Sequence, residues 1–355
     1  MWARGFYRDH VLANAKYRAY SHFCWPCLES RTHTRMTQSV ISDRLVRIQA
    51  RDGQIIRKHI WPGSGNVGRE HLLREWQMQN LVYQNFNLSS RRLVTTPLSK
   101  AADSSWFEQE DFSQSRSLWA VAQTDFDKLA EVLPSVLRVV GLIHTKKQDN
   151  SEAPAAMPEM PYPVRLDFAA HCSLPVWGRS FIGKYSALLD RLGTELEGLE
   201  PDSAQTHRLI HGDLTADNVL VSRTDEEHIR IVDWERGGYG AREHDLAALY
   251  GSILASSYYA LAGEDGTQRV SETSLSRWID KWQNLIVDIP VEYKHPINPH
   301  DFRVLLAAKL IARGYSRSIF DGPNNPLSAL LGKIAGTLLA APRKFATIWD
   351  AGMIV

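Results

Sequence analysis

The sequence predicts an α+β fold in which a small strand-rich lobe precedes a larger helical lobe. Short β-rich runs separated by turn residues dominate residues 40–112, whereas apolar patterns at helical spacing dominate residues 243–349. The length of 355 residues is enough for one large domain or two modest ones with a real core. We expect an N-terminal extension over residues 1–36, a first lobe over 37–112 and a second lobe over 113–355.

The composition is that of an ordinary globular protein, with 44% hydrophobic and 23% charged residues. A formal net charge of +1 gives no general attraction to nucleic acid or to anionic membranes, so we expect neither as a partner. No apolar run is long enough to span a bilayer, and the charged, aromatic N-terminus lacks the apolar centre of a secretion signal. A cytoplasmic protein is therefore expected, and its oligomeric state stays open.

The first lobe is expected to hold a β-hairpin, one helix and two further strands. Residues 44–50 and 54–60 are β-rich runs on either side of Asp52-Gly53, a typical hairpin turn. A helical pattern follows from Arg69 to about Tyr83. The two further strands are expected over residues 93–96 and 105–109.

The second lobe is expected to be helical apart from one hairpin. Residues 126–144 carry a continuous apolar side, and Pro134 could mark a kink or a later start of that helix. Four prolines within residues 148–163 indicate a loop or insertion. Another helix is expected over about 181–199, before a hairpin formed by residues 218–222 and 228–233.

The most informative pattern combines an Asp, an Asn five residues later and a second Asp after the next strands. Asp213 follows His211-Gly212 at the end of an apolar strand, Asn218 opens the hairpin, and Asp233 closes it. Phosphoryl transfer to a hydroxyl needs a carboxylate beside the attacking oxygen and oxygen ligands for magnesium. Each piece alone could merely cap a helix or close a turn. The ordered combination favours the catalytic interpretation.

These residues resemble the aminoglycoside phosphotransferase and choline kinase family, distant relatives of the protein kinases. The resemblance is strong over residues 208–250 and diffuse over 40–350. It implies a two-lobed protein-kinase-like fold that uses ATP and Mg²⁺, with Asp213 as the catalytic base and with Asn218 and Asp233 as metal ligands. It also implies structural roles for two residues: Asp245 would cap a helix and brace the catalytic loop, and His211 would shape that loop.

The same resemblance implies a lysine–glutamate pair in the first lobe. Lys58 lies on a predicted strand on the same side as Ile56, and Glu75 follows 17 residues later in the predicted helix. Trp106–Glu110 takes the place of the inter-lobe hinge, so we expect Glu108 and Glu110 among the nucleotide-binding residues. The phosphate loop of the family would fall near residues 34–42, a stretch without glycine.

One competing motif precedes the predicted helix. Gly63-x-Gly65-x-x-Gly68 matches a dinucleotide-binding fingerprint. Pro62 and the preceding Arg-Lys-His stretch do not suit the buried parallel strand of that fold, and neither a suitably placed acidic residue nor repeated βαβ units follow. We therefore expect these glycines to form a flexible connector into the helix.

The expected reaction transfers phosphate from a nucleoside triphosphate to the hydroxyl of a small molecule. An aminoglycoside would need a carboxylate-lined cleft, and choline an aromatic box around its quaternary nitrogen. A sugar, another natural-product alcohol or a Ser/Thr of a biosynthetic peptide is equally compatible with the sequence. A nucleotide-binding pseudokinase that acts as a partner subunit is the alternative from another class.

Overall fold

The computed structural model describes residues 38–341, except for 41–43, 51–52, 61–63, 87–92, 113, 148–175, 200–207, 226–227, 264–267, 269, 288 and 323. Residues 38–355 form one compact unit. The expected extension over residues 1–36, most of the stretch near 34–42 and the proline-rich segment 148–163 lie outside the described residues. Among the residues described, no helix has the length and apolar character needed to cross a membrane.

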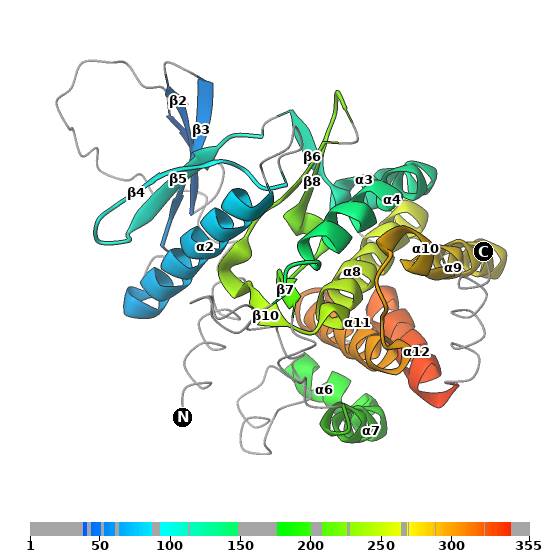
Figure 1. Ribbon diagram of the computed structural model, residues 1–355. Coiled ribbons are helices and arrows are strands. Elements are labelled where there is room, and N and C mark those ends of the chain that lie inside the picture. Colours follow the sequence, from blue (N-terminus) through cyan, green and yellow to red (C-terminus); the bar gives the residue numbers. More distant parts are fainter. Residues whose placement is uncertain are drawn as a thin grey trace. The chain divides into compact units, whose positions relative to one another are not determined.

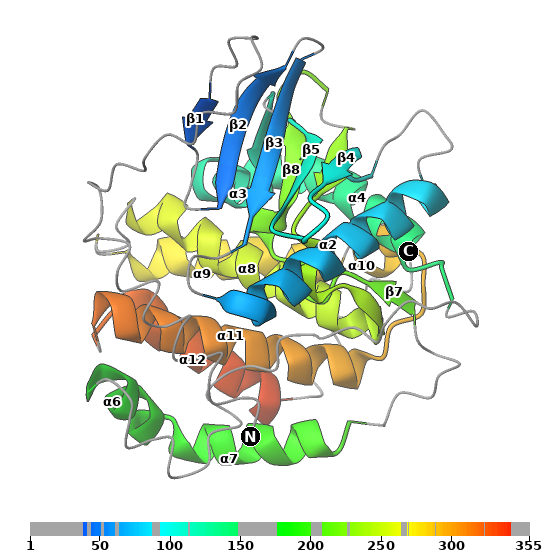
Figure 2. The ribbon, with the colours of Figure 1, turned by 90° about the vertical axis from the view of Figure 1, so that its left-hand side faces the viewer.

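The first part of this unit is a five-stranded antiparallel sheet with one long helix, α2 (Gly65–Phe86) (Figure 1). The strands lie in the order β1-β2-β3-β5-β4. Their bounds are β1 Gln38–Val40, β2 Leu45–Ala50, β3 Gly53–His59, β4 Pro97–Lys100 and β5 Trp106–Glu110. Figure 2 shows β1, β2 and β3 side by side.

The hairpin forms as the sequence predicts. Ala50 pairs with Gly53, which leaves two residues in the turn between β2 and β3. Ile48, Ile56 and Phe107 are buried in this sheet, and the register places Ile56 and Phe107 on one face and Ile48 on the other. The strand predicted over residues 93–96 is not formed there, because β4 begins only at Pro97. Leu93 and Val94 are buried in the main core instead, so their apolar character reflects tertiary packing and not a strand.

Helix α2 begins four residues earlier than predicted, at Gly65. Gly68 is a buried residue of the helix, and a Cβ placed there would lie 1.8 Å from Ser64 Oγ. The expectation of a flexible glycine connector was therefore wrong for Gly65 and Gly68. A glycine suits residue 68 because a Cβ there would collide with the side chain of Ser64, one turn earlier, whose carbonyl oxygen accepts a hydrogen bond from Gly68 N.

Strand partners change after β5. Strand β6 (Ser115–Ser117) pairs with β8 (Val219–Ser222), which pairs with β9 (Ile229–Ile231). A separate pair joins β7 (Arg208–Ile210) to β10 (Gly238–Gly240). The change of partner falls between Glu110 and Ser115, next to the lobe boundary expected at residue 112. The catalytic-loop candidates therefore lie between β7 and β8.

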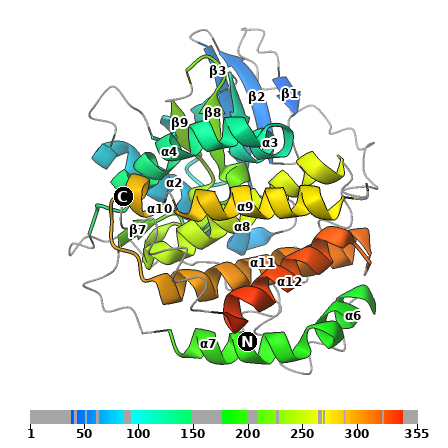
Figure 3. The same cartoon turned by 90° about the vertical axis from the view of Figure 1, so that its right-hand side faces the viewer.

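The remaining described elements are helical (Figure 3). Their bounds are α3 Leu118–Thr124, α4 Phe126–Ile143, α6 Val176–Lys184, α7 Ser186–Glu197, α8 Arg242–Ala262, α9 Glu272–Val287, α10 Ile289–Tyr293, α11 Pro299–Asp321 and α12 Pro326–Ala340, with the short 3-10 turns η1 Ala216–Asn218 and η2 Trp234–Arg236. Helix α8 is buried along nearly all its length and packs against α3 and α11. The helix expected over 181–199 is divided into α6 and α7, and α3 was not anticipated.

The structure of helix α4 settles the position of Pro134, which the sequence left open. The Asp125 side chain accepts a hydrogen bond from Lys128 N, which fixes the start of the helix before Pro134. Pro134 therefore lies inside the helix and does not begin it. The predicted apolar side, including Leu133, Val136 and Val140, is buried in the core.

Candidate active site

Asp213 lies on the loop between β7 and β8, which the backbone holds in a tight conformation. The carbonyl oxygen of Asp213 accepts hydrogen bonds from Thr215 N at 2.8 Å and from Asn218 Nδ2 at 2.9 Å. Gly212 has φ +81°, and a Cβ there would lie 2.4 Å from the carbonyl oxygen of Arg236. Only glycine fits this position, because both the backbone angle and the close approach exclude a side chain. The half-buried Asp213 is thus presented from a rigid turn.

His211 uses both ring nitrogens to hold this turn. Nδ1 accepts from the backbone N–H of Asp213 at 3.3 Å, so Nε2 carries the proton that it donates to Val232 O at 2.8 Å. The ring also packs edge-on against the buried Trp234. These contacts support the structural role expected for His211.

Asp245, in the first turn of α8, binds the catalytic loop through both carboxylate oxygens. Oδ2 accepts from His211 N at 2.7 Å and Oδ1 from Gly212 N at 2.8 Å. Burial opposes ionisation, but the hydrogen bonds from His144 and from the backbone of His211 hold the pKa of Asp245 below its ordinary value. The expected capping of a helix by Asp245 is not seen, because the residue that caps α8 is Ala241, which precedes the first helical residue Arg242 and makes no side-chain cap. Its carboxylate is directed to the loop instead.

From the sequence we missed two residues that support Asp245, namely His144 and Tyr293. His144 Nε2 lies 3.0 Å from Asp245 Oδ2, and His144 Nδ1 contacts the hydroxyl of Tyr293. His144 follows the last residue of α4 and continues its buried side. A histidine on a buried helical stripe indicates a buried polar partner, but not that the partner lies 101 residues away.

The structure places Asn218 and Asp233 on facing ends of the β8–β9 hairpin. Val232 N donates to Asn218 O at 3.0 Å, so Asp233 follows directly after the residue opposite Asn218. The amide nitrogen of Asn218 is engaged with Asp213 O, which leaves its amide oxygen as the side-chain atom suited to a cation. Asp233 adopts the left-handed conformation with φ 69°, which ends the strand and turns the chain into η2.

Lys58 joins the two lobes at this point. Its Nζ lies 2.7 Å from Glu75 Oε1 and 2.5 Å from Asp233 Oδ1. The Lys58 ammonium therefore bridges the helix α2 carboxylate and the carboxylate at the end of the hairpin. Burial disfavours that charge, but the two carboxylates raise the pKa of Lys58 above its ordinary value.

The two carboxylates that contact Lys58 differ in burial and therefore in pKa. The fully buried carboxyl of Glu75 has its pKa raised to about 7 by desolvation, which the charge of Lys58 only partly offsets. Burial also opposes ionisation of Asp233, but the charge of Lys58 and its hydrogen bond lower the pKa of Asp233 to about 2. The Asp233 side chain is 38% exposed, compared with 1% for Glu75. Asp233 thus keeps its negative charge and faces solvent.

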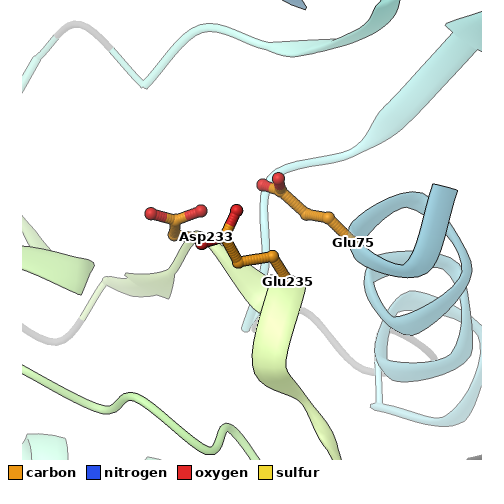
Figure 4. Close-up of side chains that lie close together, drawn as sticks. All are labelled: Glu75, Asp233 and Glu235. Atoms are coloured by element: carbon orange, nitrogen blue, oxygen red, sulfur yellow. The ribbon is translucent and has the colours of Figure 1, made fainter. Parts of the chain in front are cut away.

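Arg44 and Glu235 lie beside the Lys58–Glu75–Asp233 contact, and we call these five residues the junction. Arg44 and Glu235 were not singled out from the sequence. Arg44 Nη1 donates to Glu235 Oε2 at 3.4 Å, and Arg44 Nη2 lies 4.0 Å from Glu75. Carboxylate oxygens of Glu75, Asp233 and Glu235 lie within 4.8 Å of one another (Figure 4). Carboxylate oxygens, and amide oxygens such as that of Asn218, are the ligands that a hard cation such as Mg²⁺ prefers.

Glu108 and Glu110 lie on β5, and the part expected for them in nucleotide binding stays a prediction. Glu108 lies inside β5, where its carboxylate binds Arg57 Nη2 at 2.6 Å and Ser99 Oγ at 2.7 Å. Glu110 accepts from Thr96 Oγ1 at 2.7 Å. Both carboxylates are used within the sheet, because β5 is flanked by β3 and β4. The connection between the lobes begins only after Glu110.

Comparisons with known proteins agree with this geometry. Residues 109–274, which include the loop and the β8–β9 hairpin, match the model of the phosphotransferase enzyme family APH. No curated protein sequence matches the chain.

Two solved structures resemble it over most of its length. The amicoumacin kinase hAmiN, in complex with AMP-PNP, Ca²⁺ and Ami, has TM-score 0.50 and 14% identity, covering 94% of this chain and 93% of that chain. The choline kinase from Cryptosporidium parvum Iowa II has TM-score 0.50 and 11% identity, covering 90% of this chain and 93% of that chain. The predicted resemblance is therefore confirmed: residues 109–274 are a phosphotransferase-family segment, and the chain has the two-lobed fold of protein-kinase-like phosphotransferases.

Proposed function

We propose that this protein transfers the γ-phosphate of ATP to a hydroxyl group of a small molecule. In this reaction the acceptor oxygen forms a bond to the γ-phosphorus, and the bond from phosphorus to the bridging oxygen of ADP breaks. The hydroxyl proton passes to the carboxylate of Asp213. Asp213 suits this role because its own backbone carbonyl is fixed by Thr215 and Asn218, so the loop is already ordered before substrate binds.

The observation that carries the proposal is the contact of Lys58 with both Glu75 and Asp233. A lysine held between a helix carboxylate and the acid at the end of the hairpin is positioned to contact nucleotide phosphates. Glu75 would orient Lys58 from α2, and Arg44 would hold Glu235 and Glu75 on the other side. A buried lysine between two carboxylates can release one of them, the partly exposed Asp233, to another ligand while the buried Glu75 keeps it paired.

The donor set supports magnesium as the metal. Asn218 and Asp233 would hold the ion, which, when bound, neutralises charge on the phosphates. The Asp233 carboxylate is suited to this because it is ionised and partly exposed. Lys58 would then exchange its contact with Asp233 for one with a phosphate oxygen, while it keeps the contact with Glu75.

The test is a screen for ADP formation with a panel of hydroxyl compounds, with and without magnesium. The panel includes aminoglycosides, amino alcohols, sugars and Ser/Thr peptides. We expect slow magnesium-dependent ATP hydrolysis without acceptor, and faster turnover with at least one small molecule. Nucleotide binding without turnover under any condition would contradict the proposal and identify a pseudokinase. Turnover stimulated only by peptides would contradict the assignment of a small-molecule acceptor.

A further inference from the structure

The residues from Asp233 to Gly237 lie between helix α2 and the catalytic loop. They comprise the 3-10 turn η2 with one flanking residue on each side, and we call them the η2 segment. Helix α2 packs against η2. Figure 4 shows Glu75 of α2 facing Asp233 and Glu235 of this segment. The η2 segment is therefore the part of the second lobe that the helix carrying Glu75 contacts.

Arg74, the residue before Glu75, binds the end of the η2 segment. Arg74 Nη2 donates to the carbonyl oxygen of Gly237 at 2.7 Å, and Arg74 Nε donates to the same oxygen at 3.2 Å. Two N–H groups of one planar guanidinium on one oxygen define the direction of the contact as well as its length. Arg74 is half-buried, so water screens this contact less than it would screen one on an open surface.

The carbonyl that Arg74 binds has a fixed position. Gly237 N donates to Trp234 O at 2.9 Å, which closes the turn. A Cβ at Gly237 would lie 3.0 Å from Trp234 Cε3 and 3.4 Å from Met78 Cγ. Met78 is buried on α2, one turn after Arg74. The helix and the η2 segment are therefore closely packed at the point where the hydrogen bonds form.

The η2 segment also contacts the catalytic loop. A Cβ at Gly212, in that loop, would lie 2.4 Å from the carbonyl oxygen of Arg236. The carbonyls of Arg236 and of the next residue thus contact the catalytic loop and α2, respectively. Gly238, which follows the η2 segment, pairs with Ile210 of β7, and β7 leads into the catalytic loop. Only the backbone of the η2 segment separates the Arg74 contact from the loop that carries Asp213.

This arrangement gives Arg74 an indirect part in the proposed reaction. Glu75 follows Arg74 in the same helix, and Glu75 Oε1 lies 2.7 Å from Lys58 Nζ. We propose that Arg74 is a positioning residue that, by binding the η2 segment, keeps the Lys58–Glu75 pair in register with the catalytic loop. Arg74 acts through these two residues and does not itself contact the nucleotide. Groups of the chain itself therefore hold α2 in place before nucleotide binds.

This inference rests on the proposed phosphotransferase function, and its test separates the two. Magnesium-dependent ADP formation is measured with water as the acceptor, and ATP affinity is measured by titration. Arg74→Ala should lower kcat/KM for ATP roughly 10-fold, within the range of coupling between residues of one hydrogen-bond network. Arg74→Lys should retain part of the activity, because its ammonium group keeps a donor for the carbonyl but loses the planar fork. Arg69→Ala, an exposed arginine on the same helix, is the matched control and should leave kcat/KM unchanged.

A double-mutant cycle separates positioning from a general loss of stability. If Arg74 acts through Lys58, the loss caused by Arg74→Ala should shrink from roughly 10-fold to less than about 3-fold in a Lys58→Ala background. A role in stability alone would give the same loss in both backgrounds. Urea unfolding of each variant shows whether it is folded under the assay conditions. If the alanine variant is unfolded, Arg74→Lys takes its place in the cycle.

Each outcome has one meaning. Absence of magnesium-dependent ATP turnover in the wild type would overturn the proposed function and this inference with it. Wild-type turnover that Arg74→Ala leaves within about 2-fold would overturn the inference alone. Equal losses in the wild-type and Lys58→Ala backgrounds would do the same, because Arg74 would then only contribute to the packing of α2.

Discussion

Asp245→Asn tests how strongly the catalytic loop depends on one buried carboxylate. Asp245 accepts hydrogen bonds from two backbone amides and lies 3.0 Å from His144 Nε2. Asparagine has nearly the same shape but only one side-chain oxygen. Its amide group would therefore face a donor, and at least one buried N–H would lose its partner. One unsatisfied buried donor and the loss of charge from the remaining bonds together cost about 2–4 kcal/mol of unfolding free energy.

Urea unfolding, followed through tryptophan fluorescence, to which the buried Trp234 beside His211 contributes, measures this cost. Asp280→Asn, an exposed aspartate on α9, is the matched control and should change stability by less than about 0.5 kcal/mol. We also expect kcat to fall about 10- to 100-fold, because Asp213 would lose its fixed position. An Asp245→Asn protein as stable as the Asp280→Asn control would refute the claim that the Asp245 carboxylate stabilises the catalytic loop.

The lowered pKa of Asp245 predicts how the free energy of unfolding changes with pH. Its pKa is lowered in the folded protein, so its contribution is present above the unfolded value of about 3.9 and is lost as the pH falls through the folded value. The difference in unfolding free energy between wild type and Asp245→Asn should therefore be nearly constant from pH 5 to 7, because Asp245 is largely ionised in both the folded and the unfolded state over this range. It should shrink below about pH 4. A difference that grows in acid would contradict the lowered pKa.

Three further predictions concern the nucleotide and metal contacts. Lys58→Ala should weaken ATP binding or turnover by about 1–3 kcal/mol, measured by titration and steady-state kinetics, whereas Gly65→Ala should leave both unchanged. The reverse pattern, tested with ATP and NAD, would restore the dinucleotide interpretation. Asp233→Ala should abolish the magnesium dependence of ATP binding more completely than Asn218→Ala, because it removes a charged ligand; an unchanged dependence would exclude Asp233 as a ligand. Arg44→Lys should lower the unfolding free energy by about 1–2 kcal/mol in the same urea assay, since lysine cannot span both carboxylates; a neutral effect would remove Arg44 from the junction.

The parts of the site that lie close together in the chain could be predicted from the sequence. Asp213, Asn218 and Asp233 occupy one loop and one hairpin, so spacing alone brings them together. The pair Lys58 and Glu75, 17 residues apart, was implied by the resemblance to the family, because periodicity alone does not separate them from Arg57 and Glu70. The positions of residues within one loop or one hairpin depend on local geometry, which the sequence pattern predicts.

The contacts that cross the fold could not be predicted. Arg44 reaches Glu235 across 191 residues, and His144 reaches Tyr293 across 149. Sequence spacing contains no information about which buried polar groups meet at such separations. The neighbours of β5 were not predictable for a related reason: an alternating pattern indicates a strand, but not that the strand lies between two others. The start of α2 was missed because glycine at residue 68 usually weakens a helix, whereas close packing on Ser64 requires it here.

The most direct test of the account is the activity of Asp213→Asn with magnesium and ATP. We expect ATP affinity and the unfolding free energy to stay close to the wild-type values, because the backbone carbonyl of Asp213, and not its side chain, holds Thr215 and Asn218. The kcat for phosphoryl transfer should fall by ~10²–10⁴, the range for loss of a positioned proton acceptor. A variant that retains more than about half of the wild-type kcat would contradict the assignment of Asp213 as the base.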